Sequence, residues 1–261
     1  MAVDKKPFNK KFSVNALPPP KIMSWSYNLK QTHCCNKNIL ITSGCSFTAS
    51  TTQLKIAASW PGYLRDRCRF DYAVDLSYPG MGNDYICDTM KIYLESVDCS
   101  NVLVIVMWSG LDRVYTIGGP AFNLSPSQTT QQKQISDEEK RSRAEFSWFK
   151  IQELKDFLIS RNIPHAFTQY INLLWPPYLA YRDTTKSWDS WLKKDIVNQI
   201  RQCIDVPTNN KDFLYDWAFY NGYLNVGDQY HPPAECNLDW TDQVLIPNLA
   251  RKALIFPVDQ K

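Results

Sequence analysis

The sequence predicts an α/β fold, a three-layer sandwich in which a central parallel sheet lies between two layers of helices. Three observations support this prediction. Short apolar runs alternate along the chain with longer segments of helical periodicity, the order of elements that builds parallel sheets. Of the 261 residues, 44% are hydrophobic and 21% are charged, as in globular domains with a well-buried core. Finally, a serine or a glycine follows each of three apolar runs, where parallel sheets carry their sites: Ser46, Gly80 and Gly110.

Four short apolar runs are the candidate strands. Because helical segments separate them, we expect the strands to pair in parallel, with crossover connections between them. In chain order they are Ile39–Thr42, Tyr72–Leu76, Val102–Met107 and Ala166–Tyr170.

Three helices are expected between these strands. Trp60–Arg67 follows the first strand. Tyr85–Glu95 follows the second, and the carboxylate of Asp84 can accept hydrogen bonds from the free N–H groups of its first turn. Asp137–Ser160 follows the third, behind a capping box in which Ser136 precedes a glutamate by three residues.

Two further helices are expected in the last third of the chain. One spans Ser187–Ile204, and the other runs from about residue 234 towards residue 254. Pro247 should kink or divide this last helix, because its ring clashes with the preceding turn.

The chain is organised as an arm and one domain. Residues 1–37 are rich in Lys, Asn and Pro and show no period of a packed helix or strand, so they form an extended arm that either stays disordered or docks on another subunit. Residues 38–261 form the domain. Two insertions interrupt its alternation: residues 115–135, a polar loop after the third strand, and residues 171–227, which are rich in Trp and Tyr.

Composition excludes several classes of protein. No stretch approaches the roughly 20 apolar residues that cross a bilayer, and the start of the chain lacks a secretory signal, so we expect a cytoplasmic protein or one carried in a virus particle. A net charge of +3 is too small to indicate nucleic-acid binding. The eight cysteines have no regular spacing, and the pair Cys34-Cys35 near His33 lacks a second cysteine pair, so we expect no disulfide framework, no metal and no cofactor.

Two motifs at opposite ends of the domain carry the chemistry. Gly44-Cys45-Ser46-Phe47 follows the first strand, and Asp228 stands three residues before His231. A serine hydroxyl becomes a nucleophile when a base takes its proton and a third group orients the base. Ser46, His231 and Asp228 are therefore the candidate catalytic triad.

With these motifs the chain resembles the SGNH (GDSL-like) hydrolases over about residues 38–254, in particular a branch with Gly-Cys-Ser-Phe found in bacteriophages and marine bacteria. The resemblance implies a flavodoxin-like α/β/α fold and makes Ser46 the nucleophile. It also implies that the backbone N–H of Ser46 is the first oxyanion donor and that of Gly80, in Asp75-Leu76-Ser77-Tyr78-Pro79-Gly80, the second. Asp228 and His231 match the family's last block.

The third block departs from the family pattern. The family reads Gly-x-Asn-Asp after a buried strand, whereas this chain has Trp108-Ser109-Gly110-Leu111-Asp112-Arg113. Either the third oxyanion donor is missing, which would make a slower enzyme, or Asn83, Ser109 or Arg113 supplies it. Cys45 is an alternative nucleophile, but neighbouring side chains point in different directions, so we expect Cys45 to face the core when Ser46 faces the pocket.

The predicted function is that of a serine esterase. The resemblance implies acyl esters, with O-acetyl groups on carbohydrates as the leading substrate, and the aromatic residues of 171–227 can offer faces for sugar rings. We expect no nucleic acid and no membrane among its partners. The alternative is a structural or assembly protein, such as a virion component, that keeps the fold and uses residues 1–37 to bind a partner.

Overall fold

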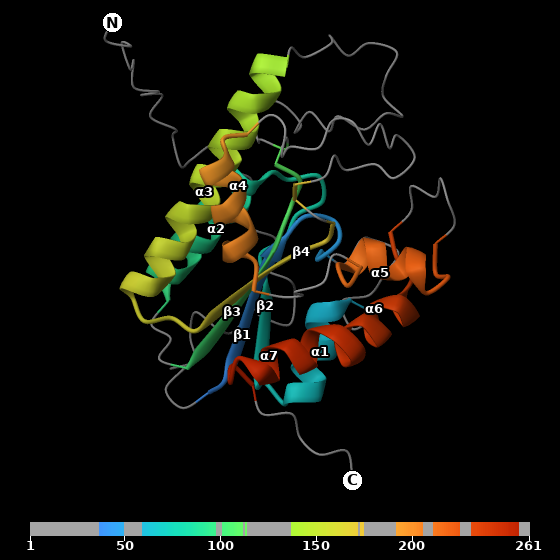
Figure 1. Ribbon diagram of the computed structural model, residues 1–261. Helices are drawn as coiled ribbons and strands as arrows, with labels where there is room; N and C mark the ends of the chain where they lie inside the picture. Colours follow the sequence, from blue (N-terminus) through green and yellow to red (C-terminus); the bar gives the residue numbers. More distant parts are fainter. Residues whose placement is uncertain are drawn as a thin grey trace, which may run out of the picture.

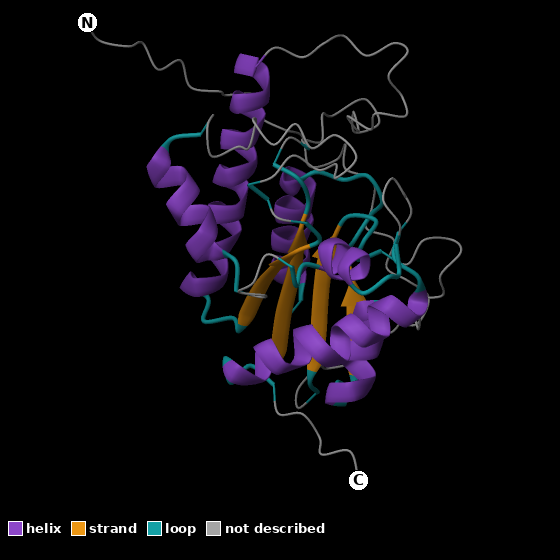
Figure 2. Ribbon diagram, turned by 45° about the vertical axis from the view of Figure 1, so that its right-hand side comes forward, coloured by secondary structure: helices purple, strands orange, loops and turns teal. Residues whose placement is uncertain are grey.

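The computed structural model describes residues 37–49, 59–97, 101–111, 113, 137–171, 173–174, 192–205, 211–224 and 231–255. In these residues a single sheet runs through the middle of the domain, with helices on both of its faces (Figure 1, Figure 2). The predicted three-layer α/β fold is confirmed.

All four candidate strands are present and pair in parallel, in the order β2-β1-β3-β4. Each is within two residues of its predicted bounds: β1 is Ile39–Gly44, β2 Tyr72–Asp75, β3 Val102–Trp108 and β4 His165–Gln169. After β1, the chain goes first to one neighbour and then to the other. The carboxyl end of β1 is therefore the topological switch point, the place where open α/β sheets bind their ligands.

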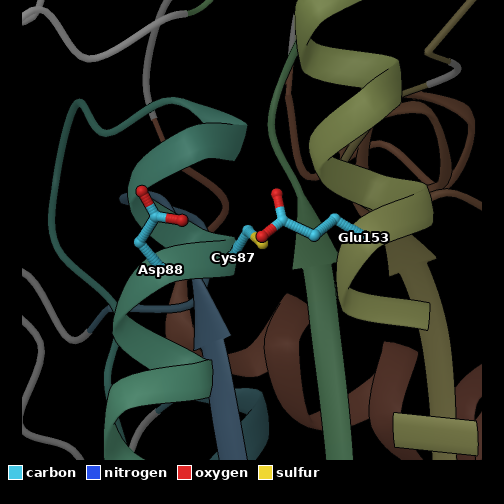
Figure 3. Close-up of side chains that lie close together, drawn as sticks. All are labelled: Cys87, Asp88 and Glu153. Atoms are coloured by element: carbon cyan, nitrogen blue, oxygen red, sulfur yellow. The ribbon is translucent and has the colours of Figure 1, made fainter. Parts of the chain in front are cut away.

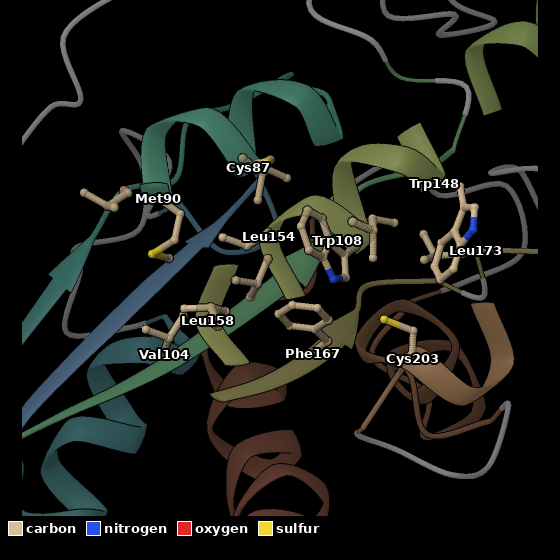
Figure 4. Packing of buried hydrophobic residues seen from close by; sticks show 14 of the residues in the cluster. Cys87, Met90, Val104, Trp108, Trp148, Leu154, Leu158, Phe167, Leu173 and Cys203 are labelled. Atoms are coloured by element: carbon tan, nitrogen blue, oxygen red, sulfur yellow. The ribbon is translucent and has the colours of Figure 1, made fainter. Parts of the chain in front are cut away.

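Three helices cover one face of the sheet. They are α2 (Asn83–Ser96), α3 (Asp137–Ser160) and α4 (Lys194–Cys203). Their apolar side chains form a continuous core with the alternate residues of the strands that face them. Figure 4 shows this core, in which the ring of Trp108 meets that of Phe167 edge to face at 5.1 Å.

The other face is covered by helices from both ends of the domain. They are α1 (Trp60–Cys68), α5 (Leu214–Tyr220) and the final helical segment, which consists of α6 (Ala234–Trp240), η6 (Thr241–Leu245) and α7 (Ile246–Arg251). Trp60 of α1 and Trp240 of α6 are fully buried against each other beneath the sheet.

Pro247 does not break the final helix. The turn before it widens into a π-helix, in which the N–H of Ile246 donates to the carbonyl of Thr241, five residues earlier. The wider turn lets the helical path continue into α7, with Pro247 in its first turn. The expected kink or division is thus replaced by a change of helix type.

Other helix boundaries differ from the predictions. Asn83 is the first residue of α2, the N-cap is Gly82 and no side chain caps the helix, so Asp84 lies inside the first turn and the expected Asp84 cap is wrong. In the insertion 171–227, a helix begins at Lys194 rather than Ser187, and α5 was not expected. Ser136, the arm and the loop 115–135 lie outside the described residues, apart from Lys37 at the end of the arm.

Among the described residues, no helix has the length and apolarity needed to cross a bilayer.

Candidate active site

Ser46 lies in a tight turn directly after β1. The carbonyl of Cys45 accepts hydrogen bonds from the N–H groups of Thr48 (3.0 Å) and Ala49 (2.9 Å), which folds the chain back at once. Ser46 is half-buried at the corner of this turn, whereas Cys45 is fully buried in the core on the α1 side of the sheet. The predicted inward orientation of Cys45 is confirmed, and a buried thiol of this kind is poorly placed to act as the nucleophile.

The turn requires a glycine before it. A Cβ atom at Gly44 would lie 2.2 Å from Oγ1 of Thr48 and 2.9 Å from the carbonyl oxygen of Met107. Any side chain at this position would therefore push the turn away from β3. Gly44 keeps the serine close to the end of the sheet.

The structure brings His231 to the Ser46 turn. The ring of Phe47, the residue after Ser46, lies 4.8 Å from the imidazole ring of His231, centroid to centroid. Phe47 also stacks on Tyr170 at 4.3 Å and meets Tyr215 edge to face at 5.9 Å. Tyr170 directly follows β4. The two ends of the domain therefore meet at the carboxyl edge of the sheet.

The surroundings of His231 favour the neutral form of its imidazole. Burial lowers the pKa of His231 below its usual value of 6.5, and the nearby positive charge of Arg113 lowers it further. The Nε2 atom is buried and makes no hydrogen bond to any described residue. A neutral imidazole with an unoccupied ring nitrogen can accept a proton, as a general base must.

Gly80 lies on a segment that runs beside the end of β1. After β2, the N–H of Leu76 donates to the carbonyl of Thr42 (2.8 Å), and that of Tyr78 donates to the carbonyl of Gly44 (3.3 Å). Gly80 then adopts φ = 80°, a left-handed conformation that favours glycine over other residues. The predicted second oxyanion donor thus belongs to a segment bonded to the strand that carries Ser46.

The three candidates for the third oxyanion donor lie together. The side chain of Asn83 accepts a hydrogen bond from the N–H of Ser109 (2.8 Å), and its Nδ2 donates to the carbonyls of Ser109 (3.1 Å) and Gly110 (3.4 Å). The side-chain amide of Asn83 therefore fixes the backbone of Ser109 and Gly110, directly after β3. The guanidinium of Arg113 donates to Oγ of Ser109 at 3.4 Å and lies over the ring of Tyr170, 5.6 Å from its centroid.

The segment that carries Arg113 is fixed through its backbone. The carbonyl of Arg113 accepts hydrogen bonds from the N–H of Asn83 (3.3 Å) and from the hydroxyl of Ser147 (3.3 Å). A Cβ atom at Gly82 would lie 2.4 Å from this carbonyl oxygen. The glycine thus permits a close approach that places the Arg113 side chain near Tyr170 and His231.

Asp228 lies outside the described residues, so its role as the orienting acid stays a prediction. Ser46, Gly80, Ser109 and Tyr170 each follow one of the four parallel strands, and the ring of Phe47 places His231 at the same edge. Sequence reasoning missed Phe47 and Tyr170. Only their positions in the sequence could have indicated them: Phe47 directly follows Ser46, and Tyr170 directly follows β4.

A second group of ionisable side chains lies between α2 and α3. Cys87 of α2 points towards Glu153 of α3, Asp88 lies beside Cys87, and the ligand atoms of the three residues lie within 4.8 Å of one another (Figure 3). Lys150 contacts Asp88 at 2.9 Å and Glu153 at 3.0 Å, and Lys91 contacts Glu153 at 2.5 Å. Because ammonium groups already pair with both carboxylates and burial raises the pKa of the Cys87 thiol, this group is an ion-pair cluster between helices rather than a metal centre.

No family model and no curated protein sequence matches the chain. Solved structures do match. The chain is similar to the psychrotrophic esterase EstA from Pseudoalteromonas sp., in a structure inhibited by monoethylphosphonate, with a TM-score of 0.50 and 13% identity over 83% of this chain and 98% of that one. It is similar to TesA with a TM-score of 0.50 and 14% identity over 84% and 100%. The chain therefore has the fold of these two proteins.

Proposed function

We propose that this protein is a serine esterase that hydrolyses acyl esters with Ser46 as the nucleophile and His231 as the base. The observation that carries the proposal is the contact between Phe47 and His231, which brings the imidazole next to the turn of Ser46. The shared fold with an esterase supports it. Asp228 completes the triad by accepting a hydrogen bond from the second imidazole nitrogen.

The reaction proceeds in two halves. Neutral His231 takes the hydroxyl proton of Ser46 as the oxygen attacks the ester carbonyl, and the tetrahedral oxyanion collapses to an acyl-enzyme as His231 gives the proton to the leaving alcohol. Water, deprotonated by the same imidazole, then releases the acid and frees Ser46. The lowered pKa of His231 favours this chemistry, because it keeps the imidazole neutral at pH 7.

The oxyanion would be stabilised by the backbone N–H groups of Ser46 and Gly80 and by one side chain. Asn83 is the weakest candidate for that side chain, since its Nδ2 already donates to two carbonyls. Ser109 and Arg113 are stronger candidates because they are hydrogen-bonded to each other and Arg113 adds a positive charge near His231. Each well-placed donor contributes about 10²–10³ in rate.

The proposed substrate is a short acyl ester, with O-acetyl groups on a carbohydrate as the leading class. Phe47 and Tyr215 are both half-buried and meet edge to face beside the proposed nucleophile, while Tyr170 is buried and stacks on Phe47. Aromatic faces with polar edges suit the apolar faces of sugar rings. Tyr215 comes from the insertion 171–227, in which the sequence predicted such a platform.

The experiment that tests the function is hydrolysis of p-nitrophenyl esters of increasing chain length. Wild-type protein should hydrolyse the acetyl ester best, and Ser46→Ala should lose at least roughly 10³-fold in kcat/KM. Cys45→Ala is the matched control, because it changes the neighbouring residue and should keep the activity. Equal rates for wild type and Ser46→Ala would contradict the proposal.

A wild-type protein without hydrolysis would favour the alternative, an assembly protein such as a virion component. In that case, deletion of residues 1–24 should weaken assembly measured by sedimentation. The arm's role as a tether and the place of the protein in a cytoplasm or a virus particle stay predictions.

A further inference from the structure

Asp75 ends β2 with its carboxylate buried beside β1. It is 6% exposed and lies opposite Thr42 in the register of the two strands. One carboxylate oxygen, Oδ1, accepts three hydrogen bonds: from the hydroxyl of Thr42 at 3.1 Å, from the N–H of Ser77 at 3.1 Å and from the hydroxyl of Ser77 at 2.5 Å. Asp75 therefore joins β1 to the first residues after β2.

The segment held in this way leads directly to Gly80. Ser77 is followed by Tyr78, whose N–H donates to the carbonyl of Gly44 at 3.3 Å. Gly44 in turn stands two residues before Ser46. The hydrogen bonds to Asp75 and Gly44 thus fix the segment 77–80 against the strand that presents the nucleophile.

The charge of Asp75 is not explained by an ion pair. No lysine or arginine among the described residues forms a salt bridge with it. Burial raises the pKa of Asp75 to about 6, while the hydrogen bonds from Ser77 and Thr42 act in the opposite direction. A buried carboxylate without a cation is costly for folding. A role in placing the segment 77–80 accounts for its presence.

We propose that Asp75 is a positioning residue for the oxyanion hole, holding the segment 77–80 so that the N–H of Gly80 meets the negative charge that develops on the substrate at Ser46. This inference rests on the proposed esterase function. It assigns Asp75 no contact with substrate and no proton transfer. Its effect reaches the reaction through Ser77 and Gly80.

The test compares Asp75→Ala, Asp75→Asn and Ser77→Ala with Leu158→Ala. Leu158 is fully buried near the end of α3, which leads to the amino end of β4, so this control loses stability far from the site. Asp75→Ala should lower kcat about 10²-fold and leave KM within about threefold, because an oxyanion donor acts in the transition state. Asp75→Asn keeps an oxygen acceptor and should restore kcat to within about fivefold of wild type.

A second readout separates positioning from folding. Phenylboronic acid forms a tetrahedral anion on an active serine, and its affinity should fall in step with kcat in Asp75→Ala but not in Leu158→Ala. If Asp75→Ala does not fold, Ser77→Ala should still lower kcat about tenfold, since it removes one of the three hydrogen bonds.

Three results would overturn the inference while leaving the esterase intact. They are wild-type kcat in Asp75→Ala and Ser77→Ala, an equal loss of kcat per folded molecule in Leu158→Ala, and an Asp75→Asn variant as slow as Asp75→Ala. Wild-type protein without Ser46-dependent hydrolysis would instead overturn the proposed function, and this inference with it.

Discussion

Two groups of ionisable side chains in this protein are held in opposite ways. Between α2 and α3, Asp88 and Glu153 are each paired with a lysine, and the interactions strengthen the charged forms: the pKa of Glu153 is lowered and that of Lys150 is raised, although burial acts against both. At the carboxyl edge of the sheet, His231 has no such partner among the described residues. Burial and the charge of Arg113 both disfavour its protonation.

This difference indicates that the helix cluster stabilises the fold, whereas the environment of His231 is suited to proton transfer. In the helix cluster, each charge is neutralised by its neighbour, so the cluster gains nothing from a further ligand or proton. At the sheet edge, the imidazole of His231 lies next to the turn of Ser46, and no described residue forms a hydrogen bond with its Nε2 atom. Perturbed groups without mutual neutralisation are typical of active sites.

The largest expected effect comes from removing the proposed base, His231. His231→Gln should lower kcat/KM at least roughly 10³-fold, because Ser46 then has no group to take its proton. Its free energy of unfolding should fall by only about 1 kcal/mol, the net value of the one hydrogen bond to Asp228 in the proposed triad, since Nε2 makes none to a described residue. Ester hydrolysis and urea denaturation measure the two quantities, and a variant that unfolds readily yet keeps its rate per folded molecule would contradict the comparison.

The opposite pattern is expected in the helix cluster. Lys150→Met should lower the free energy of unfolding by about 1–3 kcal/mol, because the half-buried carboxylates of Asp88 and Glu153 lose their shared cation. Its kcat/KM should stay at the wild-type value. The exposed Lys194→Met on α4 serves as the control and should change neither quantity.

The same cluster gives a metal test. If the lysines make it an ion-pair cluster, zinc or EDTA should leave the melting temperature unchanged, because a metal would have to displace two ammonium groups. A zinc-dependent rise in the melting temperature of wild-type protein would show that the cluster does bind metal.

The smallest expected effect concerns pH. With the pKa of His231 lowered, hydrolysis should reach half of its maximum below pH 6.5, and Arg113→Gln should move this midpoint up by less than about one unit, since burial, the larger cause, remains. The free energy of unfolding should also fall at low pH. The unfolded chain binds a proton at His231 near pH 6.5, whereas the folded chain binds it only at lower pH, so protonation between these two pKa values favours the unfolded chain. An unchanged midpoint in Arg113→Gln would show that its charge does not reach the imidazole.

Much of the fold could be predicted from local patterns. The strands were found because each is a short apolar run, and their shared carboxyl edge then placed Ser46, Gly80 and Gly110 at one side of the sheet. The wrong prediction for Asp84 has a local cause. Gly82, where a Cβ atom would lie 2.4 Å from the carbonyl oxygen of Arg113, is the N-cap, so the helix starts two residues earlier than the carboxylate suggested.

The remaining features depend on contacts between distant parts of the chain. Nothing near Asn83 indicates that its amide binds the backbone of Ser109, and nothing near Phe47 indicates that its ring meets His231. Helix α5 was missed because it is short and lies in an aromatic-rich stretch without a clear start signal. Such features depend on how distant side chains pack together, and a single sequence gives the types of these residues but not their contacts.

The π turn η6 and Pro247 compensate for each other. Proline has no N–H and its ring clashes with the turn before it, so an α-helix would be broken here, whereas the wider turn holds one more residue in the same length. The buried residues Cys236, Trp240, Leu245 and Leu249 still face the same layer as a result. Loss of one residue from 241–245 would return the turn to α-helical spacing and leave the proline inside it. In descendants of this sequence, the extra residue and the proline should therefore be inherited or discarded together.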